Sequence, residues 1–499
     1  MPYVVGCFEQ IPLGISEITL SFSHNRELGT SRLPEIITNS DVSTLNLVFN
    51  YLEDKDADVL AKILNNPKIH TLNLLDNWTG ERSINILAKA VKGSGVIKLD
   101  ASESYIGNKE IQVLAKAVKA SNVTILNLNF NNIKEEGAFA LREALKDSGI
   151  FNLDLSFNKI SDKGVVAIAD GLKGSDIITL KLKSVSMGDI GAIALAKALK
   201  GSNIMTLDLS CNSIGDQGAI ALAEALKGIN IDALGLECNN IGDKGAAAIV
   251  EALKESKISE VCFGNNSITY MGFFEMAKIL KDSRLNSIAC SKFVINKLSE
   301  NFIALKFSQN VINKKDIETL GTYLKSLDIR ILEVEGNEIG NAGAVALASF
   351  MKYTGVTELN LCDCGIGLEG VIKIVKALEG SRVEKLNVKN NLLGHEADAE
   401  LAQILKNSNI TTLELGRPLS TGLKETLREN FIGIEKGKKI AVGQVFADKL
   451  FLDSRSIDGM FRTYFSKNET KTVITALNMR ASKSIGQNKG KEGTLGFSR

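Results

Sequence analysis

The chain has 499 residues, with 59 Lys and Arg against 58 Asp and Glu, so its net charge is only +1. This balance excludes a global positive field of the kind that attracts nucleic acid or an anionic membrane. Seven cysteines, an odd number in a long chain, do not resemble the framework of a small secreted domain, and we expect reduced thiols. No segment has the roughly 20 apolar residues that a membrane-spanning helix needs.

The dominant feature of the chain is a repeat of about 27 residues. Four segments of one pattern lie 27 residues, or a multiple of 27, apart: LNLNFN (126–131), LDLSFN (153–158), LDLSCN (207–212) and LGLECN (234–239). We refer to the last position of this pattern as the ladder position. It recurs sixteen times and is asparagine at eleven: Asn25, Asn50, Asn77, Ser104, Asn131, Asn158, Val185, Asn212, Asn239, Asn266, Phe293, Asn310, Asn337, Cys364, Asn391 and Pro418.

Each part of this pattern has a physical reason. It matches the signature L-x-x-L-x-L-x-x-N/C-x-L, in which a short strand is followed by a turn and a helix. Alternation predicts that Leu126 and Leu128 enter a core while Asn127 faces out. Asparagine at the ladder position can both donate to and accept from turn backbone that would otherwise be unpaired in a buried bend.

The segments after the turns predict helices. They follow a GAxALAxALK-like pattern, with Leu141 and Leu145 on one face. Asp162, Asp216 and Asp243 stand where each helix begins, which predicts that they cap their own helices. The repeats therefore predict an α/β leucine-rich-repeat solenoid, or horseshoe, with parallel strands on the concave face and helices on the convex face.

The strand-turn-helix unit and its LxLxxNxI core resemble the ribonuclease-inhibitor type of leucine-rich repeat, over residues 16 to about 430. The resemblance implies the fold and not one function, because this repeat type serves inhibitors, GTPase activators, immune sensors and bacterial effectors. We do not infer ribonuclease inhibition, because the vertebrate inhibitor alternates two repeat types and is rich in cysteine.

Two breaks interrupt the repeat. Only 17 residues separate Phe293 from Asn310, which predicts either a truncated repeat that changes the curvature or a hinge or partner-gripping feature. After Pro418 the repeat ends, and residues 422–429 predict a capping helix. Residues 436–499 hold 13 Lys and Arg against five Asp and Glu.

These breaks predict five regions. They are an N-terminal cap (1–15), a first repeat section (16–293), a short irregular repeat and second repeat section with a C-terminal cap (294–430), a basic and partly helical region (431–480) and a disordered tail (481–499).

Candidate partner contacts are aromatic residues near the turns and two lysines of one strand segment. Aromatic side chains tend to dominate interface energetics, and the lysines form a basic spot in a trough of Asn and Asp. The alternative is that the aromatic residues are partly buried between turns and the lysines are merely solvated. Val185 replaces the ladder asparagine here and predicts an irregular turn. The candidates are Phe49, Trp78, Phe130, Phe157, Lys181 and Lys183.

The sequence predicts no catalytic site, metal site or cofactor. His24, His70 and His395 lie in distant repeats, so no zinc cluster or Ser/Cys–His pair arises from local spacing. Cys364 stands at a ladder position, where the signature tolerates cysteine, so a structural thiol is favoured over a nucleophile. Residues 433–439 are one residue short of a phosphate-binding loop.

We therefore predict a non-enzymatic interaction scaffold that binds a protein partner, and no nucleic acid, through its concave surface. The alternative is a GTPase-activating protein of the Ran-activator type, a catalytic relative of this repeat type. The basic tail differs from the acidic tail of those activators.

The expected location is the cytoplasm, because the start of the chain has no basic segment and meets Glu9 before a long apolar run. Uniform repeats, five prolines and a polar tail with Phe497 near its end resemble the leucine-rich-repeat effectors that bacteria inject into host cells. That resemblance implies action in the host cytoplasm.

Overall fold

The computed structural model describes residues 3–4, 11, 14–20, 33–47, 54–74, 81–146, 148–299, 302–307, 312, 316–391 and 398–434. The chain divides into two compact units. Unit 1 comprises Met1–Val311 and Thr322–Val334, and unit 2 comprises Ile312–Gly321 and Glu335–Arg499.

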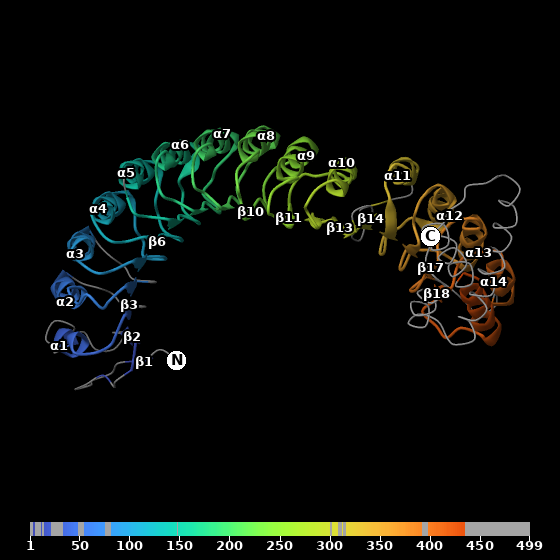
Figure 1. Cartoon of the computed structure of the whole chain (residues 1–499), viewed down its shortest axis with the longest axis horizontal. Helices are drawn as coiled ribbons and strands as arrows, with labels where there is room; N and C mark the ends of the chain where they lie inside the picture. Colours follow the sequence, from blue (N-terminus) through green and yellow to red (C-terminus); the bar gives the residue numbers. More distant parts are fainter. Residues whose placement is uncertain are drawn as a thin grey trace, which may run out of the picture. The chain divides into compact units, whose positions relative to one another are not determined.

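Unit 1 is an arc of short strands and helices, with the strands on its concave side and the helices on its convex side (Figure 1). The first ten strands form one sheet in which all neighbours are parallel and follow chain order, as the sequence predicts. They are β1 (Tyr3–Val4), β2 (Glu17–Leu20), β3 (Thr44–Leu47), β4 (Thr71–Asn73), β5 (Lys98–Asp100), β6 (Ile125–Asn127), β7 (Asn152–Asp154), β8 (Thr179–Lys181), β9 (Thr206–Asp208) and β10 (Ala233–Gly235).

A helix follows most of these strands and packs on the helix of the next repeat. The helices of unit 1 are α1 (Leu33–Thr38), α2 (Asp54–Leu64), α3 (Glu81–Lys92), α4 (Asn108–Lys119), α5 (Glu135–Leu145), α6 (Ser161–Leu172), α7 (Asp189–Leu199), α8 (Asp216–Leu226), α9 (Asp243–Leu253) and α10 (Tyr270–Lys281). Helix α11 (Ile317–Leu324) contains residues of both units.

The core of unit 1 lies between the sheet and the helices. Leu126 pairs with Leu99 on one side and Leu153 on the other, so the sheet keeps a register of 27 residues. These leucines, Leu128 of the same repeat and the helical Leu141 are all essentially inaccessible to solvent. The predicted alternation of buried leucines with outward polar residues is therefore confirmed.

The ladder asparagine joins two turns, as the sequence predicts. Asn131 is buried, and its Oδ1 accepts from the backbone N–H groups of Ser104 (3.1 Å) and Ile106 (2.8 Å) in the preceding turn. Its Nδ2 donates to the carbonyl oxygens of Ala101 (2.8 Å) and Leu128 (3.0 Å). One side chain thus satisfies buried backbone groups of two consecutive repeats.

The turn of Val185 differs from its neighbours. Val185 still donates its N–H to Asn212 Oδ1 (3.1 Å), but its own side chain is apolar and fully buried. Ser184 and Ser186, on either side of it, both have left-handed backbone (φ 55° and 62°). The residue after the ladder asparagine is not left-handed in the turns of Asn131, Asn158, Asn212, Asn239, Asn266 and Asn337. The predicted local irregularity is confirmed.

The aspartates at the helix starts cap the helices of the following repeats, whereas the sequence predicts that Asp162, Asp216 and Asp243 cap their own. Asp216 Oδ1 accepts from the N–H groups of Gly242 (2.9 Å) and Gly245 (2.8 Å) at the start of α9. The carboxylate points along the array because the neighbouring helix presents unpaired N–H groups beside it. The prediction that each aspartate caps its own helix is therefore wrong, and the hydrogen bonds of these aspartates link neighbouring repeats.

The 17-residue interval forms an antiparallel hairpin of β13 (Phe293–Ser299) and β14 (Phe302–Phe307), not a shortened parallel repeat. It follows β11 (Glu260–Cys262) and β12 (Ser287–Ala289) and is followed by β15 (Ile329–Glu333). The prediction of parallel strands throughout is therefore wrong here, because the interval is too short for a crossover helix.

Phenylalanines fill the core where the hairpin lacks a helix. Phe293 and Phe307 of the hairpin lie 4.7 and 5.1 Å, centroid to centroid, from the ring of Phe273 on α10. Phe274 stacks on Tyr323 at 4.8 Å. These large rings occupy volume that leucine and alanine fill in the regular repeats.

Unit 2 repeats the strand-helix pattern. Its parallel strands are β16 (Glu358–Asn360), β17 (Lys385–Asn387) and β18 (Thr412–Glu414). Its helices are α12 (Gly340–Phe350), the 3-10 turn η1 (Met351–Tyr353), α13 (Leu368–Ala377), α14 (Asp398–Leu405) and a final helix at 421–434. Leu423 and Leu427 of the final helix are buried, as expected of a cap. Across the described residues, every helix is too short or too polar to cross a bilayer.

Replacing Asn131 with alanine should lower the free energy of unfolding by about 3 kcal/mol, because buried backbone groups lose their partners. Asn132→Ala is the matched control, since Asn132 is exposed, and should change stability by less than about 0.5 kcal/mol. Urea denaturation measures both. Equal stability of the two variants would contradict the bridging role.

Gly245→Ala should destabilise the chain by about 2 kcal/mol, although alanine is the better helix former. A Cβ there would lie 2.7 Å from Asp216 Oδ1 and 2.8 Å from Ala219 Cβ. Gly93→Ala is the control, because nothing lies within 4 Å of its Cβ position. Thermal unfolding compares the two, and a Gly245→Ala variant as stable as wild type would argue against close approach of the helices.

Candidate functional site

Four of the six predicted contact residues lie on three neighbouring repeats of unit 1, Lys181 in β8 and the other three in the turns. The rings of Phe130 and Phe157 stack at 4.1 Å between centroids, with an angle of 8° between their planes. Lys183 Nζ lies 5.6 Å from the centre of the Phe157 ring, and the Phe157 N–H donates to the Lys183 carbonyl (2.7 Å). We name Phe130, Phe157, Lys181 and Lys183 the aromatic–lysine patch. Phe49 and Trp78 lie outside the described residues and remain predictions.

The two phenylalanines are held in an unfavourable backbone conformation. Phe130 and Phe157 have φ of 52° and 55°, in the left-handed region that costs a bulky residue roughly 1–2 kcal/mol. The equivalent position is taken by smaller residues in other repeats, among them Asn265 and Asn390. Asparagine tolerates this conformation better. Phenylalanine is therefore not the residue that the turn geometry favours.

The patch also gains little from burial. Phe130 is 49% exposed, the most of any described phenylalanine except Phe431. The predicted alternative, burial between neighbouring turns, describes Phe157 in part, since it is half-buried by its neighbours. For Phe130 the structure favours an exposed ring.

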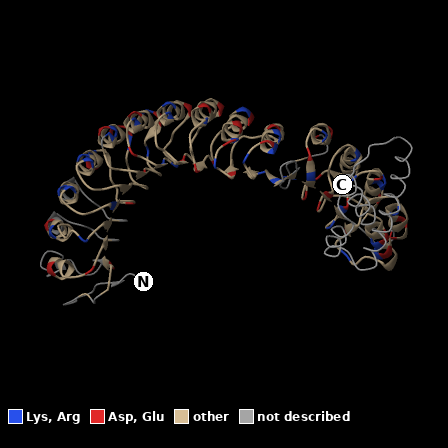
Figure 2. Ribbon diagram, viewed as in Figure 1, with Lys and Arg blue, Asp and Glu red and all other residues tan. Residues whose placement is uncertain are grey.

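The two lysines of the patch differ in their electrostatic surroundings. Lys181 Nζ lies 3.5 Å from Asp154 Oδ2, which is largely buried, so this ion pair already neutralises much of its charge. No described carboxylate lies within ion-pair distance of Lys183. Figure 2 shows that basic and acidic residues are interspersed along the strands of unit 1. The cation available to a partner at the patch is therefore Lys183.

Tyr105 was missed by the sequence reasoning. It follows ladder residue Ser104, has left-handed backbone (φ 55°) and is 62% exposed, on the turn that precedes the turn of Phe130. The sequence signal that identifies Tyr105 is its place in the repeat, because it stands one residue after a ladder position that lacks asparagine. Val185 is followed by left-handed Ser186 in the same way.

The described cysteines have properties of structural thiols. All six are free, and Cys364 at its ladder position is fully buried, donating its N–H to Asn391 Oδ1 (3.1 Å). Burial raises the pKa of the Cys364 thiol to about 11 and that of the Cys290 thiol to about 12. A thiol with a raised pKa is a poor nucleophile at neutral pH. In the described parts of the chain, no three His, Cys, Asp or Glu side chains converge to hold a metal.

At pH 8, native Cys290 and Cys364 should react with iodoacetamide at least about 100-fold more slowly than after unfolding, because only about one Cys364 thiol in a thousand is a thiolate. Raising the pH toward 11 should speed the reaction of Cys364 first, since its pKa is the lower of the two. Mass spectrometry of labelled peptides measures both rates. Fast labelling of either thiol in the native protein at pH 8 would refute the assigned burial.

Comparison with protein families supports the repeat assignment. A model described as Leucine Rich repeat matches residues 119–141, 152–169, 202–223, 231–250, 325–348 and 356–375. The chain therefore contains leucine-rich repeats in both units, as the strand register requires. A search of curated proteins gives no match.

Solved structures of three proteins are similar to this chain at low identity. An internalin (inlF) from Listeria monocytogenes is 16% identical, covers 77% of this chain and 89% of its own, and has a TM-score of 0.36. A chain of the yeast Rad7–Elc1 complex is 15% identical, with 68% and 81% covered and a TM-score of 0.35. The Arabidopsis receptor kinase HAESA ectodomain, solved with a peptide hormone, is 12% identical, with 71% and 67% covered and a TM-score of 0.33.

Proposed function

We propose that this chain is a scaffold that binds a protein partner through the concave side of unit 1, with the aromatic–lysine patch as the anchor. The observation that carries the proposal is a pair of stacked phenylalanines in left-handed backbone, one of them half exposed. Leucine-rich repeats commonly act as interaction scaffolds, and a rigid array orders little on binding.

The energetics of the patch favour a binding role over a structural one. A left-handed phenylalanine costs stability, and the exposed Phe130 ring recovers little of that cost by burial. Stability alone would favour asparagine, which stands at the equivalent position in two other repeats. Covering both rings with a partner would remove apolar surface from water and recover the cost on binding.

The patch also indicates the chemistry of the partner. The stacked rings offer a flat apolar surface, suited to an aromatic or aliphatic side chain. Lys183, beside the Phe157 ring, adds a cation that a carboxylate of the partner can reach. We therefore propose that the partner presents an apolar side chain next to an Asp or Glu.

Phe130→Asn/Phe157→Asn tests this function. The variant should be at least as stable as wild type, because asparagine suits left-handed backbone, and should lose partner binding by about 100-fold or more. Quantitative affinity capture, with wild type and variant compared on the same lysate, identifies proteins that depend on the patch, and denaturant unfolding measures stability.

Phe139→Asn is the matched control, because Phe139 is a similarly exposed phenylalanine (45%) on the convex helix α5. It should capture the same proteins as wild type. If both variants retain every partner, or both lose the same ones, the patch is not the anchor. Trp78→Ala and Lys181→Glu/Lys183→Glu extend the test to the other predicted contacts.

A further inference from the structure

A second surface of unit 1 lies on the edge where the strands begin and the helices end. Ile97, Phe151 and Ile178 each stand one residue before a strand and are 42%, 39% and 39% exposed. Thr124 and Met205 occupy the same position in their repeats and are partly exposed. Five uncharged residues thus stand at one position of five consecutive repeats.

Backbone hydrogen bonds place these five residues side by side. The Thr124 N–H donates to the Ile97 carbonyl (2.8 Å), and the Phe151 N–H donates to the Thr124 carbonyl (3.0 Å). The same bond joins Ile178 to Phe151 and Met205 to Ile178, each at 2.8 Å. At the spacing of neighbouring strands, this apolar row extends about 19 Å along the edge.

Polar residues stand at the same position in the repeats on either side of the row. In the series of backbone hydrogen bonds, the residue before Ile97 is His70, whose carbonyl accepts from the Ile97 N–H. The residue after Met205 is Asp232, whose N–H donates to the Met205 carbonyl. Beyond these, Ser43 and Ser259 hold the position. At this position of the described repeats, exposed apolar side chains therefore occur only in the repeats from β5 to β9.

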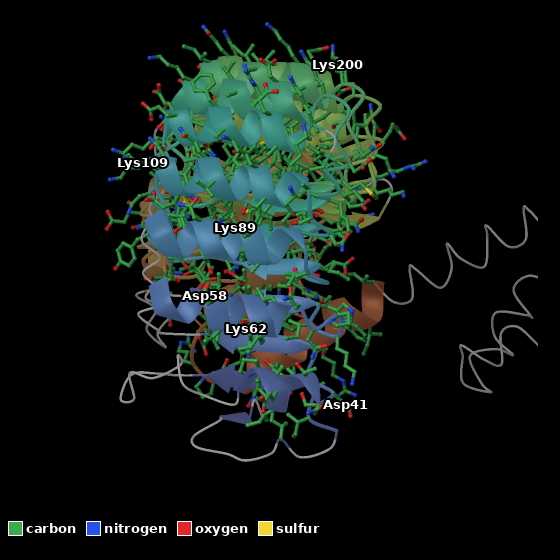
Figure 3. All side chains as sticks on the ribbon, turned by 90° about the vertical axis from the view of Figure 1, so that its left-hand side faces the viewer. Asp41, Asp58, Lys62, Lys89, Lys109 and Lys200 are labelled. Atoms are coloured by element: carbon green, nitrogen blue, oxygen red, sulfur yellow. The ribbon has the colours of Figure 1, made fainter. Side chains whose placement is uncertain are left out.

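Exposed lysines lie on the same edge, at the last turns of α2, α3 and α4 and at the start of β5, and they coincide with the apolar row in its first two repeats. The segments 61–71, 88–98 and 115–125 together contain no Asp or Glu. Figure 3 labels Lys62 on α2 and Lys89 on α3, together with Asp58, which lies one turn before Lys62. The lysines of this basic edge are Lys62, Lys89, Lys92, Lys98, Lys116 and Lys119; Lys68 of segment 61–71 is also exposed but pairs with Asp41 (3.3 Å).

Helix ends alone do not account for this concentration of charge. One lysine near a helix C-terminus is favoured by the helix dipole, and Lys92, Lys146, Lys173 and Lys227 all stand there. Three residues earlier, α5, α6 and α8 carry an acid that pairs with that lysine, at 3.8, 3.7 and 2.6 Å. Helices α3, α4 and α7 instead carry a second lysine three residues before the first, in the pairs Lys89 and Lys92, Lys116 and Lys119, and Lys197 and Lys200, and these like charges weaken the helix.

A flat anionic surface fits this edge. The strands pair in register, so their first residues lie in one row along the rim of the arc, and apolar and basic side chains both project from that rim. Exposed apolar residues beside clustered lysines are the two features that bind a protein to the surface of an anionic bilayer. The whole-chain charge of +1 conceals this local concentration.

We propose that the strand-start edge of unit 1 docks on an anionic lipid bilayer, with the lysines contacting headgroups and Ile97, Phe151, Ile178 and Met205 entering the interfacial region. The aromatic–lysine patch lies at the opposite, strand-end side of the same repeats. A docked chain thus keeps the patch away from the bilayer and available to a protein partner.

Vesicle co-sedimentation of the full chain tests the proposal. Vesicles of phosphatidylcholine with about one third phosphatidylserine should bind the wild type at physiological salt, and pure phosphatidylcholine should bind it at least about tenfold more weakly. Binding should fall steeply in molar salt. Lys89→Gln/Lys92→Gln/Lys116→Gln should lower binding about 100-fold, because each lysine near the surface contributes about fivefold.

Lys146→Gln/Lys173→Gln/Lys227→Gln is the matched control, with the same change in charge at lysines that are already paired. It should bind within about threefold of wild type. Ile97→Ser/Phe151→Ser should lower binding about tenfold at constant charge. Phe130→Asn/Phe157→Asn should leave vesicle binding unchanged, which separates this proposal from the proposed function.

Three results would overturn the proposal: no binding of wild type to the anionic vesicles, equal loss in the two lysine variants, or equal binding to neutral vesicles. Binding of soluble polyglutamate with the same lysine dependence, without vesicle binding, would assign the edge to an acidic protein instead. Circular dichroism of each variant identifies any that has unfolded, and the salt dependence of the wild type then remains as the test.

Discussion

The hydrogen bonds of the ladder asparagine are the interaction on which the rest of the structure depends. Strands of three residues cannot form a stable sheet alone, and each turn buries backbone groups that need partners. Asn131 supplies those partners to two turns at once. Carboxylates such as that of Asp216 do the same between helices. Neighbouring repeats are thereby joined both at the turn and at the start of the helix, and the same set of hydrogen bonds recurs from repeat to repeat.

Because the framework is satisfied by buried residues, the outward positions of each repeat are free to vary. Three groups of outward residues depart from the repeat pattern. They are the stacked phenylalanines at two turns, the apolar row at the strand starts, and the two neighbouring lysines at each of three helix ends. Each departs from what the local structure favours, by left-handed backbone, by apolar exposure or by like charges. These are the outward positions at which the residue present is not the one that stabilises the repeat best.

The period of the sequence predicts much of the fold, because a 27-residue register dictates which leucines and asparagines meet. It does not predict the partner of Asp216, since capping the next helix depends on the lateral distance between helices, which is a tertiary quantity. Nor does it distinguish a shortened repeat from the hairpin of β13 and β14. Phe130 and Lys183 were identified by residue type, but their contact with Phe157 follows from the register.

Hydrogen–deuterium exchange of the chain, free and bound to a partner captured by wild type, tests the central claim most directly. The account predicts added protection at turn residues 129–132 and 156–159 and in β6 to β8, with little change in the convex helices α5 to α7, since the buried framework does not move on binding. Protection confined to the convex helices or to unit 2, with these turns unchanged, would contradict the account.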